Sequence, residues 1–512
     1  MFHRGEGFSL EQLPPGRTRI IYPAEPLNPL PNPDDSIRQA LLNPIDDDPL
    51  PSKLFAGMKL TIVFDDISLP LPQMRRPDIR QRIIEQVLDM AAEANVDDVH
   101  IIAALALHRR MTENELRHAV GDRVYDAFAP SDLLYNMDAE DPDQMVMLGA
   151  TSEGEEVQMV RRAAESDLVV YVNINMVSMN GGWKSTATGL SGYQGIRHHH
   201  NVDTLLKSSL MDHTDSEFHN KNWRQGDVIK AAGVKIFQVE TTINNNVFGL
   251  DNPMTVLQKR EWEWTPRDRD AFVGLQKGLQ LLPRKARRKV FNDHQSPYGM
   301  TSVQAGEVEA VHELAVANML KQQSVQIEGQ ADILTMGIPY LSPYNVNSIL
   351  NPILVMVNGL GYFFNMYRNK PLVRKDGVII MTHPTPIEFH PVHHPSYIDF
   401  FEQVLPDTTD GHKIAHKYEK QFAEDEWYRH LYRTSYAYHG VHPLYMWYWG
   451  SNAMNHAARI IIVGGDVRAV RRMGFTPAST MQDALEIASD VVGPQPTITH
   501  LHNPPVLMAE VI

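Results

Sequence analysis

Cysteine is absent from all 512 residues. This absence excludes disulfide bonds, a thiolate nucleophile and zinc or iron–sulfur sites held by cysteine. The first residues, Met-Phe-His-Arg-Gly-Glu-Gly, also lack the apolar segment of a secretory signal. Since neither absence points to another compartment, the cytoplasm is the default expectation.

Long apolar runs and a positive net charge are lacking too. The run from Ile101 to Leu107 is typical of the longest apolar runs, whereas a membrane-spanning helix needs about 20 residues. The formal net charge of −15 would make nucleic acid or an anionic membrane repel the chain as a whole. We therefore expect neither nucleic acid nor a membrane as a partner. A local basic cleft is compatible with this net charge.

The composition indicates a globular protein with more than one domain. Apolar residues make up 43% and charged residues 21%, and 512 residues exceed what one core usually holds. Residues 1–52 hold many prolines and predict an irregular arm that wraps or links. We expect a Pro-rich arm at 1–55, an N-terminal α/β domain at 56–280 and a C-terminal α/β domain at 290–500, with a cleft between the two domains.

Short apolar strands alternate with amphipathic helices along the chain. Isoleucines, valine and leucine after Pro77 follow the 3.6-residue period of a helix, and Thr112-Glu-Asn-Glu115 is typical of a capping box. This alternation favours an α/β fold with mostly parallel, doubly wound sheets. Strands are predicted at 60–64, 99–106, 167–173, 234–239, 332–335, 377–382 and 459–463.

Polar side chains follow two of these strands. His108 comes two positions after the strand at 99–106, and Asp65 and Asp66 end the strand that starts at Leu60. Open α/β sheets bind ligands at the carboxyl ends of their strands, so a histidine there suits acid–base chemistry. The carboxylates could orient that histidine, hold a ribose hydroxyl or bind a cation. A surface histidine and a simple turn or helix cap are the structural alternatives.

A glycine-rich turn carries a lysine at Gly181-Gly-Trp-Lys-Ser185. Glycines let the backbone approach a phosphate closely, and lysine is both a cation and a nucleophile. The turn is not a nucleotide P-loop, because Trp183 stands where that motif needs the glycine before its lysine. It suggests a nucleotide-like cofactor without ATP hydrolysis, and the alternative is a connection with a solvated lysine.

Two histidine clusters are candidate metal ligands. Arg197-His-His-His200 follows the lysine turn, and three consecutive imidazoles cannot all face one site, so at most one is expected to bind a metal. His390-Pro-Val-His-His394, with His383 upstream, is interpreted as structural. The aromatic block from Trp427 to Trp449 is interpreted as an insertion with its own packing, and no role is assigned to it.

Taken in this order, these segments resemble the lactate racemase family, whose enzymes use a nickel-pincer nucleotide. The resemblance covers roughly residues 58 to 495. The N-terminal similarity lies in Asp66-Ile-Ser-Leu-Pro70, Ala103 to Arg109, Leu148-Gly-Ala-Thr151, Gly181-Gly-Trp-Lys184 and His200. The C-terminal similarity lies in residues 332–347, 377–382 and 459–487.

The resemblance implies a cofactor and the residues that hold it. Lys184 would anchor the nickel-pincer nucleotide (pyridinium bisthiocarboxylate mononucleotide) through a thioamide, in an N-terminal cofactor-binding domain. Gly181, Gly182 and Ser185 would cradle its phosphate. His200 would bind nickel beside the sulfur and carbon donors of the pincer, in the square-planar geometry that Ni(II) accepts.

The resemblance also implies a reaction, the racemisation or epimerisation of a 2-hydroxy acid. His108 would take the hydroxyl proton while the carbon-bound hydrogen leaves as hydride to the cofactor, and Asp66 would take part in the site. Asp66 and Ser68 would also contact the cofactor. The expected partner is a small hydroxy acid, and the sequence leaves open whether the chain forms homo-oligomers.

Three departures from the family pattern indicate a substrate other than lactate. Leu69 replaces an arginine, with Arg75 and Arg76 close behind. A second acid–base histidine is missing from 173–180, and a lysine expected near Pro352 is absent. One-sided redox or elimination chemistry on the same scaffold, or a non-catalytic cofactor-binding homologue, are the alternatives that these departures leave open.

Overall fold

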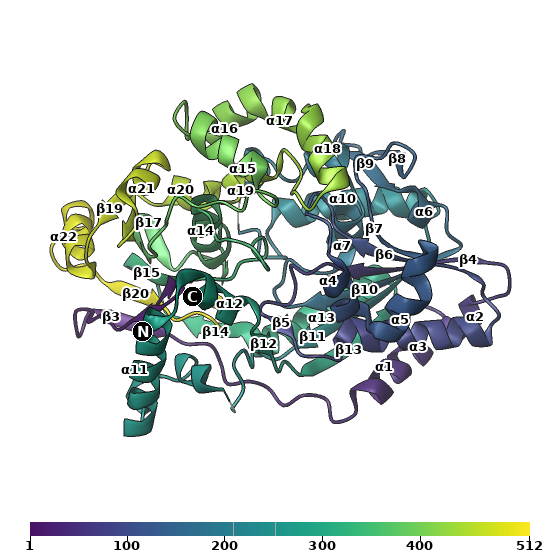
Figure 1. Cartoon of the computed structure of the whole chain (residues 1–512), viewed down its shortest axis with the longest axis horizontal. Helices are drawn as coiled ribbons and strands as arrows, with labels where there is room; N and C mark the ends of the chain where they lie inside the picture. The colour runs from purple at the N-terminus through teal and green to yellow at the C-terminus, as the bar shows by residue number, and fades with distance from the viewer. Residues whose placement is uncertain (208, 251) are drawn as a thin grey trace.

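The computed structural model describes residues 1–207, 209–250 and 252–512. The two largest β-sheets of the described residues are mostly parallel and lie one in each half of the molecule, with helices packed around them (Figure 1). The predicted α/β class is therefore confirmed. None of the helices in the described residues is both long and apolar enough to cross a bilayer.

The first sheet has the strand order β13-β11-β10-β4-β6-β7, and only the pair β11–β13 is antiparallel. All eight residues of β10 are buried, as expected for a strand covered on both faces. The strands are β4 (Lys59–Asp65), β6 (Asp98–Ala104), β7 (Leu134–Asn136), β10 (Leu168–Asn175), β11 (Ile236–Ile243) and β13 (Met300–Gly306).

The helices of this half include the two that the sequence predicted. Asp78 caps the helix after Pro77, and the capping box of Thr112 and Glu115 is present as expected. The main helices are α3 (Ile79–Glu93), α4 (Glu113–Val120), α5 (Asp122–Phe128), α7 (Gly182–Gly189), α10 (Glu217–Ala231) and α13 (Val308–Gln323). Shorter elements are α6 (Arg161–Ala164), α8 (Tyr193–Ile196), α9 (Val202–Leu205) and the hairpin β8 (Met145–Ala150) with β9 (Glu156–Val160).

The second sheet is built around β15, which pairs in parallel with β17, β20 and β1. All its pairs are parallel except β1 with β2. Its strands are β1 (Phe2–Gly5), β2 (Phe8–Ser9), β3 (Thr18–Ile21), β15 (Ala331–Pro339), β17 (Val373–Thr382), β18 (Arg459–Val463), β19 (Thr476–Ala478) and β20 (Ile498–Leu501).

The helices of the second half follow its strands and also project from it. The longest are α11 (Pro266–Leu281), α12 (Arg284–Asn292) and α22 (Met481–Val492), and α22 packs on β17 and β18. The segment after β15 holds α14 (Pro352–Met356) and the π-helix η4 (Val357–Phe363). Beyond β17 lie α15 (Pro395–Asp399), α16 (Gly411–Ile414), α17 (Lys420–Glu424), α18 (Glu426–Thr434), α19 (His442–Trp449), α20 (Ser451–His456) and α21 (Val467–Arg472).

The N-terminal arm is more regular than predicted. Its first residues form β1, β2 and β3 of the second sheet, whereas α1 (Pro33–Leu42) packs near β13 of the first. The arm therefore links the two halves, as the prediction had it, but with strands and a helix. Short strands between prolines left no long periodic pattern in the sequence.

The first sheet also extends beyond the range predicted for the N-terminal domain. Strand β13 lies at residues 300–306, inside the range assigned to the C-terminal domain, and pairs antiparallel with β11. Helix α13 then packs on β11 and β13. The pattern of apolar residues predicts a strand's type but not which sheet it joins, so the boundary could not be placed from composition.

The aromatic block does not pack on its own. Helix α19 is buried at every residue and contacts η4 and α14. The Tyr432 hydroxyl donates to the Ala106 carbonyl at 3.1 Å, and the His439 amide donates to the Leu107 carbonyl at 3.2 Å. These bonds bring the block to the carboxyl end of β6, so the interpretation as a separately packed insertion is wrong.

We expect Gly337→Ala to detach β1 from the second sheet. A Cβ at Gly337 would lie 2.3 Å from the His3 amide nitrogen, which is backbone and cannot rotate away. The free energy of unfolding should fall by about 1–3 kcal/mol, measured by urea denaturation. Gly278→Ala is the matched control, because Gly278 is exposed within α11 with nothing within 4 Å. It should raise stability by roughly 0.5–1 kcal/mol.

Candidate functional site

A single cavity of about 210 Å³ is lined by residues from both halves of the molecule. From the first half come the carboxyl ends of β4, β6 and β10 together with α7. From the second half come the segment after β15, η4 and α19. The predicted site residues that line it are Asp66, Ser68, His108, Lys184, Ser185 and His200. The structure therefore brings six of the eight predicted side chains to one place.

His108 lies in a buried turn after β6, and Asp66 orients its ring. The strand ends at Ala104, two residues earlier than predicted, because Ala106 takes a left-handed φ of 52°. The chain then turns back, and His108 Nδ1 lies 2.8 Å from Asp66 Oδ2. Leu105, Ala106 and Leu107 in this turn are buried, which explains why the apolar run of the sequence continues past the end of the strand.

The ionisation of Asp66 settles which ring nitrogen of His108 carries a proton. Burial acts to raise the pKa of Asp66, but the charge and hydrogen bond of His108 and the bonds from Ser68 bring it below its usual value. An ionised carboxylate only accepts, so His108 Nδ1 is the donor and Nε2 presents a lone pair. Ser68 donates two hydrogen bonds to Asp66 Oδ1, one from its backbone amide at 2.9 Å and one from its hydroxyl at 2.5 Å.

Lys184 places a primary amine against the cavity from the first turn of α7. Burial lowers its pKa, and the negative charges of Asp65 and Asp66 oppose that shift. Burial also raises the pKa of Asp65 to about 6. Among the described residues, no hydrogen bond or salt bridge holds the Lys184 ammonium. An unpaired amine with a lowered pKa is a better nucleophile than a surface lysine.

His200 is the only one of the three consecutive histidines that lines the cavity. Its Nδ1 lies 2.7 Å from Nδ1 of His199. Its other ring nitrogen, Nε2, has no polar partner within the described part of the chain. Burial, with smaller contributions from Lys184 and His108, lowers the pKa of His200 to about 3. The ring is therefore neutral, which is the form that binds metals.

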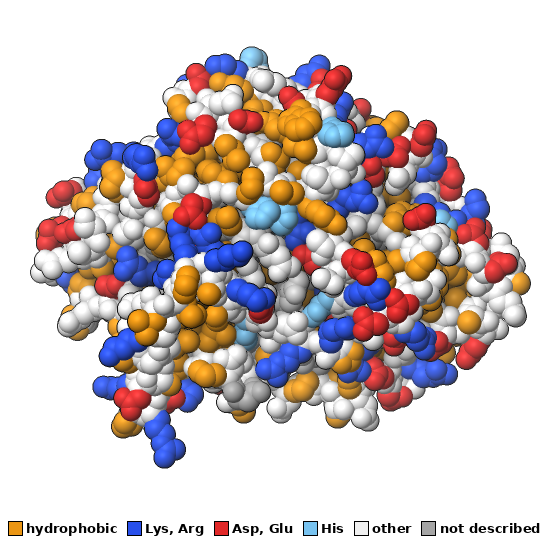
Figure 2. Space-filling model, in the orientation of Figure 1, with side chains coloured by type: hydrophobic (Ala, Val, Ile, Leu, Met, Phe, Trp, Pro, Cys, Tyr) orange, Lys and Arg blue, Asp and Glu red, His pale blue; other side chains and the backbone are white. Residues whose placement is uncertain are grey.

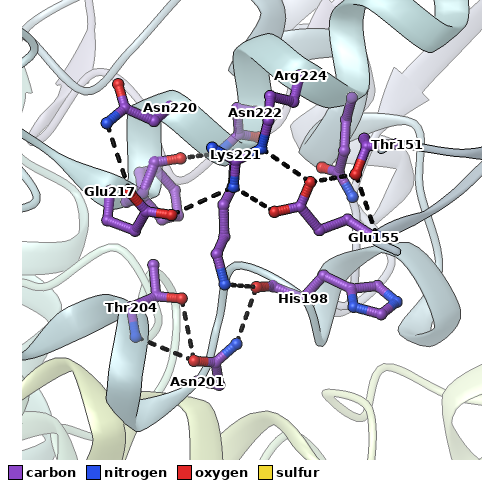
Figure 3. A network of polar contacts seen from close by, with 12 residues as sticks. Thr151, Glu155, His198, Asn201, Thr204, Glu217, Asn220, Lys221, Asn222 and Arg224 are labelled. Carbon is purple, nitrogen blue, oxygen red and sulfur yellow. Dashed lines mark hydrogen bonds and ion pairs between the residues drawn. The ribbon is translucent and has the colours of Figure 1, made fainter. Parts of the chain in front are cut away.

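The turn that carries His200 is held from α10. Figure 3 shows Lys221 reaching the carbonyl of His198, at 2.8 Å, where the Asn201 side-chain amide also donates. Asn201 in turn accepts from the Thr204 amide and caps α9. With its backbone bonded at both ends, this turn fixes the direction of the His200 ring.

In the glycine turn, a carboxylate lies where the resemblance implied a phosphate. The Gly182 amide donates to Glu240 Oε1 at 2.6 Å, and Glu240 Oε2 accepts from the Asn175 amide at 2.6 Å. A Cβ at Gly181 would lie 2.5 Å from this buried carboxylate. Gly181 and Gly182 do not line the cavity. In this structure, the glycines make room for Glu240, and a phosphate at the Gly182 amide would have to displace it.

Comparison with protein families matches residues 5–211 to the lactate racemase N-terminal domain. The first two fifths of the chain are therefore similar to this domain. The resemblance predicted from the sequence is thereby confirmed. A search of curated proteins found no match.

The fold of the whole chain is similar to that of solved structures. The lactate racemase apoprotein from Thermoanaerobacterium thermosaccharolyticum aligns with a TM-score of 0.63 and 16% identity, covering 99% of each chain. A protein from Thermotoga maritima aligns with a TM-score of 0.51 and 12% identity, covering 96% of this chain and 100% of that one. At these identities the likeness shows the fold alone.

The residues of this cavity could hold part of the pincer nucleotide that the resemblance implied. The unpaired amine of Lys184 and the free Nε2 of His200 face one cavity, which suits a covalent anchor and one metal ligand. The described residues contain no group of three or more His, Asp or Glu side chains that could hold a metal alone. Nickel would therefore need donor atoms from the cofactor itself.

An aromatic wall of the cavity was missed in the sequence. Its members line the cavity from the second half of the molecule, and they are Tyr344, Tyr362, His442, Tyr445 and Trp449. Three of them belong to α19, whose residues are apolar on all sides and carry no helical period that would mark one face. The His-Pro start of α19 was the only local signal, and it is too short to indicate a site.

Lys184 is the only lysine or arginine among the described residues that line the cavity. Leu69 lines it where the family has arginine, and the nearby arginines are elsewhere. Arg76 pairs with Asp122 at 2.9 Å, and Arg75 donates to the Gln295 carbonyl. In this structure neither arginine lines the cavity.

We expect Asp65→Asn to make Lys184 more reactive. The Asp65 carboxylate stabilises the ammonium and so raises the pKa of Lys184, and its removal should lower that pKa. Labelling with limiting acetic anhydride, read by peptide mass spectrometry, should rise several-fold near pH 7.5, and the gain should vanish below about pH 6, where Asp65 itself is protonated.

The exposed residue Asp270 on α11 provides the control. Asp270→Asn should leave the labelling of Lys184 as in the unmodified protein. Equal labelling of Lys184 in all three proteins would show that Asp65 does not act on this amine.

Proposed function

We propose that this protein is an isomerase that racemises or epimerises a 2-hydroxy acid with a nickel-pincer nucleotide. The observation that carries the proposal is that Lys184, His200 and His108 face one cavity with their reactive nitrogens unpaired. The lactate racemase N-terminal domain at residues 5–211 supports the same class of reaction.

Each of the three residues has a defined task under this proposal. The Lys184 amine would bind the cofactor covalently, and His200 Nε2 would complete its nickel coordination. When bound, the cofactor supplies reversible acceptance of the carbon-bound hydrogen of the substrate. Such chemistry belongs to the cofactor, and the protein supplies binding, orientation and proton transfer.

His108 would take the proton from the substrate hydroxyl. Asp66 holds Nδ1–H, so the Nε2 lone pair is available to the hydroxyl without a change of tautomer. When the proton arrives, the nearby ionised carboxylate stabilises the imidazolium. The pair therefore serves as a base in one direction and an acid in the other.

The lining of the cavity supports a substrate larger and more apolar than lactate. Besides His442, the aromatic wall of the cavity is made of tyrosine and tryptophan rings, and the hydroxyls of Tyr344 and Tyr362 bond to each other at 2.7 Å. Apolar and aromatic walls stabilise ligands that bring apolar surface out of water. A 2-hydroxy acid with an aromatic or branched side chain matches this lining best.

One-sided oxidation of a hydroxy acid is the second candidate. The observation that favours it is that, within the described residues, His108 is the only cavity histidine oriented by a carboxylate. Incubation of single enantiomers in deuterated buffer separates the two, because only the isomerase yields the mirror-image acid.

We expect protein produced together with the cofactor pathway to carry an adduct on Lys184 and about one nickel per chain. Intact-mass spectrometry and metal analysis measure the two quantities. Lys184→Ala should lose the adduct, whereas His200→Ala should keep it and lose most of the nickel, because only a metal ligand is removed.

Lys289→Ala provides the control, since this lysine lies on the surface with 73% of its side chain exposed. It should retain both adduct and nickel. Absence of nickel and of an adduct from the unsubstituted protein, together with no inversion of any acid in a panel of aromatic and aliphatic 2-hydroxy acids, would refute the proposed function.

A further inference from the structure

We infer that His442, the first residue of α19, is a second proton-transfer residue of the cavity and serves the enantiomer that His108 does not. The inference rests on the proposed function and adds a residue to it. Three arguments support it: the position of the His442 ring, the contacts of its two nitrogens, and the geometry that inversion at a carbon centre requires.

The His442 ring lines the cavity beside His108. The two ring centroids are 5.4 Å apart and the rings meet edge to face. Tyr344 and Tyr438 surround the ring on its other sides, at 4.9 and 4.6 Å between centroids. His442 is 2% exposed, so its orientation is fixed by packing rather than by solvent.

One nitrogen of His442 is bonded and the other is not. Nδ1 lies 2.6 Å from the hydroxyl of Tyr397, which is fully buried. Nε2 is buried and has no hydrogen-bond partner among the described residues. Leaving a buried polar atom unpaired costs roughly 1–3 kcal/mol, which a ligand bonded to that atom would recover. Because the His442 ring lines the cavity, we expect a bound acid to supply the missing partner.

Tyr397 allows His442 both to accept and to donate a proton at Nε2. A carboxylate, as in the His108 pair, only accepts and holds one tautomer. A tyrosine hydroxyl can donate to Nδ1 or accept from it, so either tautomer of His442 keeps this bond. The residue can therefore take a proton from a hydroxyl and return it to an oxygen.

The surroundings keep His442 neutral before substrate binds. Burial lowers its pKa well below the usual value, and the imidazoles of His108, His394, His200 and His439 add to the shift. Among the described residues, the carboxylates that line the cavity are Asp65 and Asp66, and Asp66 is bonded to His108. A neutral imidazole is the form able to accept the hydroxyl proton.

Inversion at a carbinol carbon needs two positions for the oxygen. If the carbon-bound hydrogen of both enantiomers faces the same acceptor, the hydroxyl and one other substituent must exchange places between them. A single base can reach the hydroxyl of only one enantiomer without a large movement. Two adjacent imidazoles, each with a free Nε2, meet this requirement.

The proton step at His442 is a simple transfer. The O–H bond of the bound acid breaks, its electron pair stays on oxygen, and a new N–H bond forms at His442 Nε2. In the return direction the same proton goes back to the oxygen. The carbon-bound hydrogen and its electron pair are exchanged with the cofactor of the proposed function, so the overall reaction is redox-neutral.

The test is a comparison of His442→Gln with His108→Gln in the cofactor-loaded full chain. Each variant is mixed with single enantiomers of the 2-hydroxy acid that the unsubstituted protein inverts, and the 2-oxo acid formed in one turnover is trapped by acid quench. We expect His442→Gln to lose roughly 10²-fold or more with one enantiomer, and His108→Gln with the other.

Mirror-image selectivity is a signature that a merely structural defect would not produce. His456→Gln is the control, because His456 bonds to the Val373 carbonyl and does not line the cavity. Equal losses with both enantiomers in His442→Gln would overturn the inference while leaving the proposed function intact. If the unsubstituted protein inverts no acid, the proposed function itself fails.

A second measurement does not depend on turnover. The ¹⁵N resonance of a histidine Nε2 reports whether it carries a proton or accepts a hydrogen bond. On saturation with the same acid, the Nε2 resonances of His108 and His442 should shift, and that of His456 should not. An unmoved His442 resonance, with His108 shifted, would show that the substrate does not reach it.

Discussion

The turn that follows β6 is the point on which the two halves of the molecule depend. Arg109 is buried there and forms a bidentate pair with Glu115, at 2.7 and 2.9 Å. The same guanidinium donates to the carbonyl of Val346, and Asn347 donates to Glu115. A buried guanidinium is costly unless all its donors are satisfied, so the second half must keep its carbonyl at this place.

The turn after β6 also positions residues that line the cavity. His108 is the neighbour of Arg109, and the carbonyls of Ala106 and Leu107 receive the bonds that fix the aromatic block. One short turn thus holds His108, whose ring is oriented by Asp66, and positions α19 against it. The two proton-transfer residues that we assign come from segments more than three hundred positions apart in the chain.

The charges around the cavity separate its chemistry into two regions. On the side of the first sheet, Asp65, Asp66 and Lys184 provide two carboxylates and an amine. Burial raises the pKa of Asp65 and lowers that of Lys184, whereas His108 and Ser68 bring the pKa of Asp66 below its usual value. On the side of the second sheet, the aromatic wall carries few charges and keeps His442 neutral. A substrate bound between them meets its polar groups on one side and its apolar substituent on the other.

Local patterns in the sequence determined the apolar strands, the capped helices and the residues at the ends of β4 and β6, because period and capping depend on neighbours in the chain. They also marked Lys184 and His200, through the glycine turn and the histidine run. Only the tertiary structure decided that β13 joins the first sheet, that Glu240 occupies the glycine turn, and that His442 meets His108. Those contacts join distant segments, and the free energy that fixes them comes from burial and pairing that no local pattern records.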